Sequence, residues 1–254
     1  MLLTRPAPIF PIVKSQKGRS HWYEIDGEKV CGVTTCSGLY PKGGLVQGAA
    51  NAVARSVKER WTAGVAFKQE EIDSHLEECR KEYVSDWRGQ ADVGTKIHEK
   101  IHSFIEAGAV ELQNEPEVVR NGFQAFLNWF YEHEVTFVAS ELVVGSRKHG
   151  FSGTLDGLGY VDKKFTLLDW KSSKAVTPDH FLQTGAYQLG LEESYDYFPP
   201  IQQRIILRVP KDGSDFEAKV VPTDINLDKE TFLHLLAFQK VLGIYEQHNP
   251  YKAR

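Results

Sequence analysis

The sequence has few cysteines, and their spacing is not that of a metal site. Cys31, Cys36 and Cys79 are the three cysteines among 254 residues, and no C-x-x-C pair occurs. This pattern argues against an iron–sulfur cluster and against a four-cysteine zinc site. A disulfide framework is not indicated either, so we expect a reducing compartment: the cytoplasm, or the host cytoplasm for a viral protein.

Three further features are missing. No run of about 18 apolar residues predicts a membrane span, and residues 1–18 lack the continuous apolar core of a secretory signal. No G-x-x-x-x-G-K-[ST] motif occurs, so we expect no ATP binding.

The formal net charge of −4 gives no overall attraction to nucleic acid. Any DNA binding must therefore come from local basic residues and a bound metal ion.

The composition, 41% hydrophobic and 25% charged, is ordinary for a globular protein. Residues 1–19 predict an extended arm, and residues 21–33 alternate around Asp26-Gly27, which indicates a β-hairpin. Helical spacing follows over 45–60, 69–88, 92–106 and 116–133. The rest of the chain predicts strands over 135–145, 151–161, 165–171, 201–209 and 215–221, and helices over 178–192 and 227–247.

This order of elements predicts an α/β (α+β) fold, in which a central mixed β-sheet is flanked by helices and preceded by a helical N-terminal region. We divide the chain into residues 1–90 and residues 91–254. The first part holds the arm, the hairpin and helices packed on the core, and the second part is the core itself. The two parts are expected to form one compact unit.

Two acids and a lysine are predicted to converge in the middle of the chain. Asp156 lies in one expected strand and Asp169 near the end of the next, and a tight turn joins these strands. Lys171 shares a strand face with Asp169, because side chains alternate along a strand. The charge of Lys171 would partly offset the repulsion between the two carboxylates, and a hard divalent cation would complete their neutralisation. A surface salt-bridge cluster at a hairpin is the alternative interpretation.

The chemistry of phosphodiester hydrolysis gives this arrangement a purpose. A metal ion held by carboxylates lowers the pKa of water and clamps the phosphate. A lysine beside the metal can stabilise the charge that develops during the reaction. Ser172 could donate a hydrogen bond to the phosphate, or could only end the strand.

A second pair of polar residues follows on the next expected helix. Gln183 and Tyr187 are four residues apart and so share one helical face. Their amide and hydroxyl groups would position a phosphate backbone near the metal. The alternative is an amphipathic helix whose tyrosine only packs on the sheet.

Residues 98–102 read His-Glu-Lys-Ile-His, which matches the HExxH motif of zinc metalloproteases. The third zinc ligand of the longer HExxHxxGxxH motif is missing, and Lys100 is an unusual residue inside such a motif. We therefore do not favour a metalloprotease. His102 would then contact DNA or serve as a packing residue.

Several other side chains are candidates for contacts with nucleic acid. The basic residues expected around the acids could bind phosphates, or could form the solvated rim of a hairpin: Arg147, Lys148, Lys163, Lys164, Lys171 and Lys174. Trp22 and Tyr23, in the early hairpin, are candidates for stacking on unpaired bases.

Asp156, the D-W-K triplet at 169–171, the Gln183/Tyr187 pair and the G-T-x-x-H of 94–98 together resemble the RecB-like branch of the PD-(D/E)XK nucleases. Within this branch the sequence looks most like phage exonucleases and the mitochondrial genome maintenance exonuclease. The resemblance covers about residues 90–210 and implies a restriction-endonuclease-like core. The four cysteines of the cluster-bearing members are absent, so no iron–sulfur cluster is expected.

The resemblance implies a role for each matching residue. The metal ligands, for Mg²⁺ or Mn²⁺, would be His98, Asp156, Asp169 and the backbone carbonyl of Trp170. The catalytic residues would be Lys171, Asp169 and Asp156. Gln183 and Tyr187 match the family's Q-x-x-x-Y motif and would bind substrate together with Ser172. Glu141, in the strand before Asp156, matches an acid often found there, and we place it with the substrate-binding residues.

The sequence therefore predicts a metal-dependent DNA nuclease that acts in replication, repair or recombination. An exonuclease on single-stranded or end-bearing DNA is expected from the resemblance alone, since no residue pattern dictates a free end. DNA and proteins of replication or recombination are the candidate partners. A non-catalytic nucleic-acid-binding scaffold on a nuclease fold is the main alternative.

Overall fold

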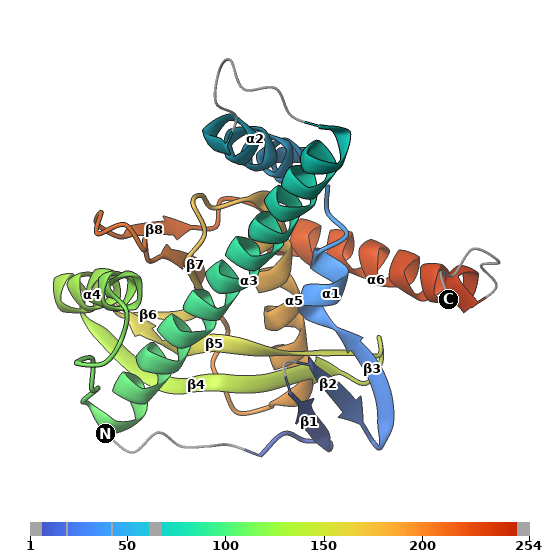
Figure 1. The fold of residues 1–254 in the computed structure, drawn as a ribbon. Helices are drawn as coiled ribbons and strands as arrows, with labels where there is room; N and C mark the ends of the chain where they lie inside the picture. The colour runs from blue at the N-terminus through green and yellow to red at the C-terminus, as the bar shows by residue number, and fades with distance from the viewer. Residues whose placement is uncertain (1–6, 19, 42, 61–67, 248–254) are drawn as a thin grey trace. The chain divides into compact units, whose positions relative to one another are not determined.

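The computed structural model describes residues 7–18, 20–41, 43–60 and 68–247. The elements in chain order are β1 (Ile12–Lys17), β2 (Ser20–Ile25), β3 (Glu28–Gly32), α1 (Val33–Ser37), α2 (Gly43–Arg60), α3 (Gln69–Ala107), α4 (Glu117–Glu132), β4 (Val135–Ser146), β5 (Phe151–Val161), β6 (Lys164–Lys171), α5 (Pro178–Ser194), β7 (Gln203–Arg208), β8 (Glu217–Val220) and α6 (Ile225–Gln247). Figure 1 shows them with these labels.

The chain divides into two compact units. The larger unit consists of Met1–Tyr40 and Ile97–Arg254, and the smaller unit is Pro41–Lys96. All the strands belong to the larger unit, whereas α2 and most of α3 belong to the smaller one. The division of the chain into domains at residue 90 remains a prediction.

The predicted hairpin forms β2 and β3. Asp26 and Gly27, between these strands, both have positive φ angles of 52° and 82°, as in the tight turn expected for this dipeptide. The structure corrects one expectation for the N-terminal arm. Ile12–Lys17 is not a free extended arm but a strand, β1, which pairs with β2 along its whole length. Residues 1–6 and 19 of the predicted arm lie outside the described residues.

The two helices expected over 69–88 and 92–106 are one continuous helix, α3. No proline separates them, and a glycine such as Gly89 inside a helix costs only about 1 kcal/mol relative to alanine. The helix ends where predicted, before Gly108, whose φ angle is +71°. Within the described residues no helix, α3 included, has a stretch that is long and apolar enough to cross a membrane.

The central sheet is built around β5. β4 pairs antiparallel with one edge of β5 from Phe151 to Val161. On the other edge β6 pairs antiparallel with residues 157–161, and β3 pairs parallel with residues 151–152. β7 lies parallel to β6 and antiparallel to β8, and α5 makes the crossover from β6 to β7. The predicted mixed sheet flanked by helices is thus confirmed.

β3 and β6, which pair with the same edge of β5, leave a short opening between them. Among the described residues, 153–156 have no ladder partner on the edge shared by β3 and β6. Two hydrogen bonds that involve side chains lie at this opening. The Tyr23 hydroxyl hydrogen-bonds to Thr154 Oγ1 at 2.9 Å, and the Trp170 N–H donates to Asp156 Oδ2 at 2.8 Å.

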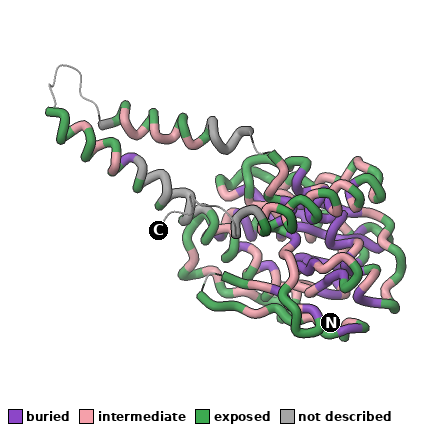
Figure 2. The backbone as a smooth tube through the Cα atoms, turned by 90° about the vertical axis from the view of Figure 1, so that its right-hand side faces the viewer, coloured by how far each residue is buried: buried purple, intermediate pink, exposed green. Residues whose placement is uncertain are grey.

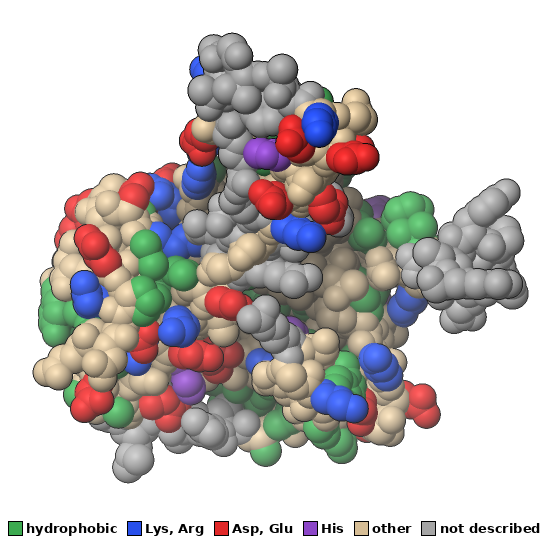
Figure 3. All heavy atoms as spheres, in the orientation of Figure 1, with side chains coloured by type: hydrophobic (Ala, Val, Ile, Leu, Met, Phe, Trp, Pro, Cys, Tyr) green, Lys and Arg blue, Asp and Glu red, His purple; other side chains and the backbone are tan. Residues whose placement is uncertain are grey.

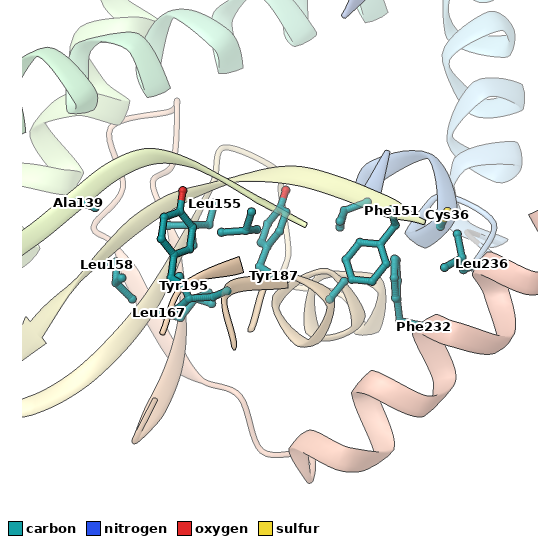
Figure 4. Packing of buried hydrophobic residues seen from close by; sticks show 14 of the residues in the cluster. Cys36, Ala139, Phe151, Leu155, Leu158, Leu167, Tyr187, Tyr195, Phe232 and Leu236 are labelled. Carbon is teal, nitrogen blue, oxygen red and sulfur yellow. The ribbon is translucent and has the colours of Figure 1, made fainter. Parts of the chain in front are cut away.

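Apolar side chains cover both faces of the sheet in the larger unit. One buried cluster joins the sheet to α1, α5 and α6, and Figure 4 shows several of its members, among them Leu155, Leu158, Leu167, Tyr187 and Phe232. A second, aromatic cluster of Phe126, Trp129, Phe137 and Trp170 joins the sheet to α4. In Figure 2 the buried segments concentrate in the interior of the larger unit.

β4 and β5 are packed tightly against each other at Gly159. A Cβ atom there would collide with the carbonyl oxygen of Thr136 and lie 2.9 Å from Phe137 Cα. Because both neighbours are backbone, we expect Gly159→Ala to lower the free energy of unfolding by about 1–3 kcal/mol. Urea denaturation followed by tryptophan fluorescence measures this loss.

Gly243, on α6, provides the matched control, since a Cβ atom there meets nothing within 4 Å. Gly243→Ala should leave stability unchanged or raise it by up to about 1 kcal/mol, because alanine is the better helix former. Equal losses in the two variants would contradict the packing argument.

Candidate active site

Asp156 and Trp170 meet at the opening of the sheet. The β5–β6 ladder stops at the pair Gly157–Leu168. Beyond this pair, the Trp170 N–H donates to the Asp156 carboxylate at 2.8 Å instead of to a carbonyl of β5. The N–H and C=O of one strand residue point toward the same neighbouring strand. The Trp170 carbonyl therefore faces the same opening, as the sequence-based ligand assignment requires.

Asp169 and Lys171 lie on the opposite face of β6 from the Trp170 ring, as the two-residue alternation predicts. Asp169 is fully buried, and the Lys171 ammonium lies 2.5 Å from its Oδ2 atom. The two groups form an ion pair, and the other oxygen of Asp169, Oδ1, has no hydrogen-bond partner within the described residues. Ser172 is half-buried and directly follows β6.

His98, from α3, and Glu141, from β4, approach Asp156. The His98 Nδ1 atom lies 3.4 Å from Asp156 Oδ1. One ligand atom from each of the three side chains lies within 4.8 Å of the others, which is close enough for a single metal ion. Glu141 and Asp156 both lie between the ladder pairs Ser140–Gly157 and Leu142–Leu155, and the φ angle of +51° at Glu141 is a strained backbone conformation.

The two aspartates have different protonation behaviour. Burial raises the pKa of Asp156, but the neighbouring His98 outweighs it and, with the Lys171 charge, holds this pKa below its usual value. Burial raises the pKa of Asp169 to about 6, even though the Lys171 charge opposes it. Asp156 therefore stays ionised, whereas Asp169 gains from any additional positive charge.

His98 and Glu141 are also perturbed. Burial lowers the pKa of His98, but the Asp156 carboxylate more than compensates and the net shift is upward. Burial raises the pKa of Glu141 to about 7, and the charge of Asp156 adds to this shift. In the absence of a cation these groups share protons, and a divalent cation would replace them.

Gln183 and Tyr187, on α5, are in direct contact. The Gln183 Nε2 group donates to the Tyr187 hydroxyl at 2.7 Å, and both residues are buried. Burial and the charge of Asp169 raise the pKa of Tyr187 well above its usual value, so the hydroxyl stays neutral. Because this hydroxyl already accepts a hydrogen bond, its own hydrogen remains available for donation.

Sequence reasoning missed the contribution of the N-terminal strands. Tyr23 and Lys14 are partners in the β1–β2 register. The Lys14 ammonium lies 3.9 Å from the Glu141 carboxylate. The expectation that Tyr23 stacks on bases is wrong, because the residue is only 5% exposed and its hydroxyl is hydrogen-bonded to Thr154.

His98 and His102 do not form one ligand pair. His102 Nδ1 lies 3.0 Å from the Ser140 hydroxyl, which in turn donates to the backbone carbonyl of Asp156. Glu99, the middle acid of the HExxH match, is exposed. The contact from His102 through Ser140 links α3 to the strand that carries Asp156, which the sequence did not predict.

The basic residues do not all surround the site. Lys163 and Lys164 lie at the turn that begins β6, and Lys171 ends this strand. At about 3.3 Å per residue the ends of the strand are roughly 23 Å apart. Arg147 pairs with Asp26 at 2.6 Å rather than facing the acids. On the face in Figure 3, acidic and basic side chains of the larger unit are intermingled.

The sequence matches no family model and no curated protein. The fold is similar to that of several solved structures, among them the following two. One is an alkaline exonuclease (LHK-Exo) from Laribacter hongkongensis, with a TM-score of 0.34, 13% identity and coverage of 63% of this chain and 91% of that chain. The other is LHK-Exo in complex with dAMP, with a TM-score of 0.34, 14% identity and coverage of 61% of this chain and 83% of that chain.

The raised pKa of Glu141 predicts a pH-dependent cost in stability. Because burial raises this pKa from 4.5 to about 7, the folded chain binds a proton more tightly than the unfolded chain. Stability is then lost as the pH rises from about 4.5 through 7. In EDTA, Glu141→Gln should raise the melting temperature at pH 8 and should have less effect at pH 5.

Glu132→Gln, on the exposed end of α4, is the control for the loss of one negative charge. It should shift the melting temperature little at either pH. Differential scanning calorimetry at pH 5 and pH 8 compares the two variants. A destabilising effect of Glu141→Gln at pH 8 would contradict the electrostatic account.

Proposed function

We propose that this chain is a divalent-metal-dependent deoxyribonuclease that hydrolyses phosphodiester bonds, and that it acts as an exonuclease. One observation carries the proposal. The His98, Glu141 and Asp156 group lies close to the Asp169–Lys171 pair, since the charges of Asp156 and His98 both act on Asp169. The overall negative charge of the chain does not by itself favour DNA, so this local arrangement provides the main argument.

The residues fit a hard divalent cation. Carboxylate and carbonyl oxygens suit Mg²⁺ and Mn²⁺, and a single imidazole is compatible with Mn²⁺. Asp169 is paired with the Lys171 ammonium, yet its pKa remains raised to about 6, so this one cation does not fully compensate the burial of the carboxylate and a further positive partner would stabilise it. We assign His98, Asp156, Asp169 and the Trp170 carbonyl as ligands. We add Glu141 to this set, because its carboxylate reaches His98 and Asp156.

Each side chain of the site would have a separate role in hydrolysis. A bound Mg²⁺ or Mn²⁺ would supply a water of lowered pKa and neutralise phosphate charge. The Lys171 ammonium, beside Asp169, would stabilise negative charge on the phosphoryl oxygens. The neutral Tyr187 hydroxyl, oriented by Gln183, would donate a hydrogen bond to the phosphate. Ser172, next to Lys171, would provide a further donor.

Removal of the lysine tests the catalytic assignment. We expect Lys171→Met to reduce metal-dependent cleavage of labelled DNA by about 100-fold or more, the usual effect of losing a group that stabilises transition-state charge. EDTA should abolish cleavage by the wild-type protein, and Mg²⁺ or Mn²⁺ should restore it.

The matched control is Lys164→Met, an exposed lysine at the far end of the same strand. It should retain nearly full activity, and circular dichroism should show a native fold for both variants. Full activity of Lys171→Met would refute the assignment. A wild-type protein that binds DNA but never cuts it in either metal would instead support a non-catalytic scaffold.

The exonuclease assignment makes a separate prediction. End-labelled linear DNA and closed circular DNA, each single- and double-stranded, are incubated with Mg²⁺ or Mn²⁺ and resolved on gels. We expect the linear substrates to be degraded and the closed circles to persist, because an exonuclease needs a free end. Cutting of the circles would overturn the exonuclease assignment while leaving the metal-dependent hydrolysis intact.

A further inference from the structure

Two cysteines lie side by side outside the candidate active site. Cys31 is in β3 and Cys36 is in α1, and their Sγ atoms are 2.6 Å apart. Gly32 is the last residue of β3 and directly precedes α1, so the strand and the helix that carry the two cysteines follow one another in the chain. A disulfide bond has a length of about 2.05 Å, so only a small movement of the two sulfurs would bring them to bonding distance.

The surroundings give the two thiols different reactivity. Cys36 is 0% exposed and belongs to the buried cluster with Phe232 and Leu236, as Figure 4 shows. Cys31 is half-buried, so a small solute can reach it. The hydrogen bond from Cys36 lowers the pKa of the Cys31 thiol, and the charge of Lys240 adds to this effect. Cys31 is thus the more nucleophilic sulfur of the pair.

The position of Lys240 is fixed by the fold. Its ammonium, from α6, donates to the carbonyl of His149 at 2.8 Å. The next residue, Gly150, accepts a hydrogen bond from the Cys31 N–H. These two contacts hold the lysine close to the start of β5, where β3 pairs with it. A cation held near a thiol favours the thiolate, which is the form that reacts with peroxides.

We propose that Cys31 and Cys36 form an oxidation site, at which a hydroperoxide converts the two thiols into an intramolecular disulfide. The Cys31 thiolate attacks the peroxide, forming Cys31–SOH and releasing hydroxide or alkoxide. The Cys36 thiol then attacks the Cys31 sulfur, forming the S–S bond and releasing water. The peroxide takes up the two electrons that the thiols lose. This site is independent of the proposed nuclease function.

Mass spectrometry of the full-length protein tests the site. The protein is treated with hydrogen peroxide in equimolar amount, denatured and alkylated. We expect a disulfide that lowers the mass by about 2 Da, located in the single tryptic peptide 30–42 that holds Cys31 and Cys36, and alkylation of Cys79 alone. Dithiothreitol should restore alkylation at all three cysteines. Cys79, in the other compact unit, serves as the internal control.

Two single variants test the order of events. Cys36→Ser should stop at the Cys31 sulfenic acid, which dimedone traps, and Cys31→Ser should leave Cys36 unoxidised. Cys36 is buried, and the wild-type peptide map decides the question if its variant fails to fold. Alkylation of both Cys31 and Cys36 after peroxide treatment, or a disulfide that includes Cys79, would overturn the proposal.

Discussion

The hydrogen bond from the Trp170 N–H to the Asp156 carboxylate replaces a rung of the β5–β6 ladder. Because this side chain substitutes for a backbone acceptor, the two strands can separate without leaving a buried N–H unpaired. The other oxygen of the Asp156 carboxylate lies 3.4 Å from His98 Nδ1, and Glu141 approaches it from β4, on the other edge of β5. The same bond fixes the orientation of Asp156, so the position of each neighbouring group depends on it.

The acids of the site lie in a region from which the surrounding side chains exclude water. Trp170 packs against Phe126 and Trp129 on one side of β6, and Tyr187 closes the other side from α5. Exclusion of water raises the pKa of Asp169, and close approach to Asp156 adds to the effect. Such an arrangement is unfavourable for a stable empty protein, and it is favourable for binding a cation.

Much of the fold could be predicted from the sequence because periodicity and turn chemistry are local. The hairpin at Asp26-Gly27, the end of α3 at Gly108 and the alternation of Asp169, Trp170 and Lys171 were all expected. The continuity of α3 was not expected, because the sequence between residues 88 and 92 lacks a strong signal for a continuous helix. The contacts of Lys14, Tyr23 and Ser140 were missed since they depend on pairing between distant strands.

The parallel pairing of β3 with β5 has a consequence for folding. It joins Cys31 and Phe151, which are separated by about 120 residues of chain. Closing so long a loop is entropically expensive, so the first three strands should dock only after β4, β5 and β6 have assembled from neighbouring segments. Tyr23 and Lys14, which lie beside the opening between β3 and β6, are therefore among the last residues to reach their final positions during synthesis.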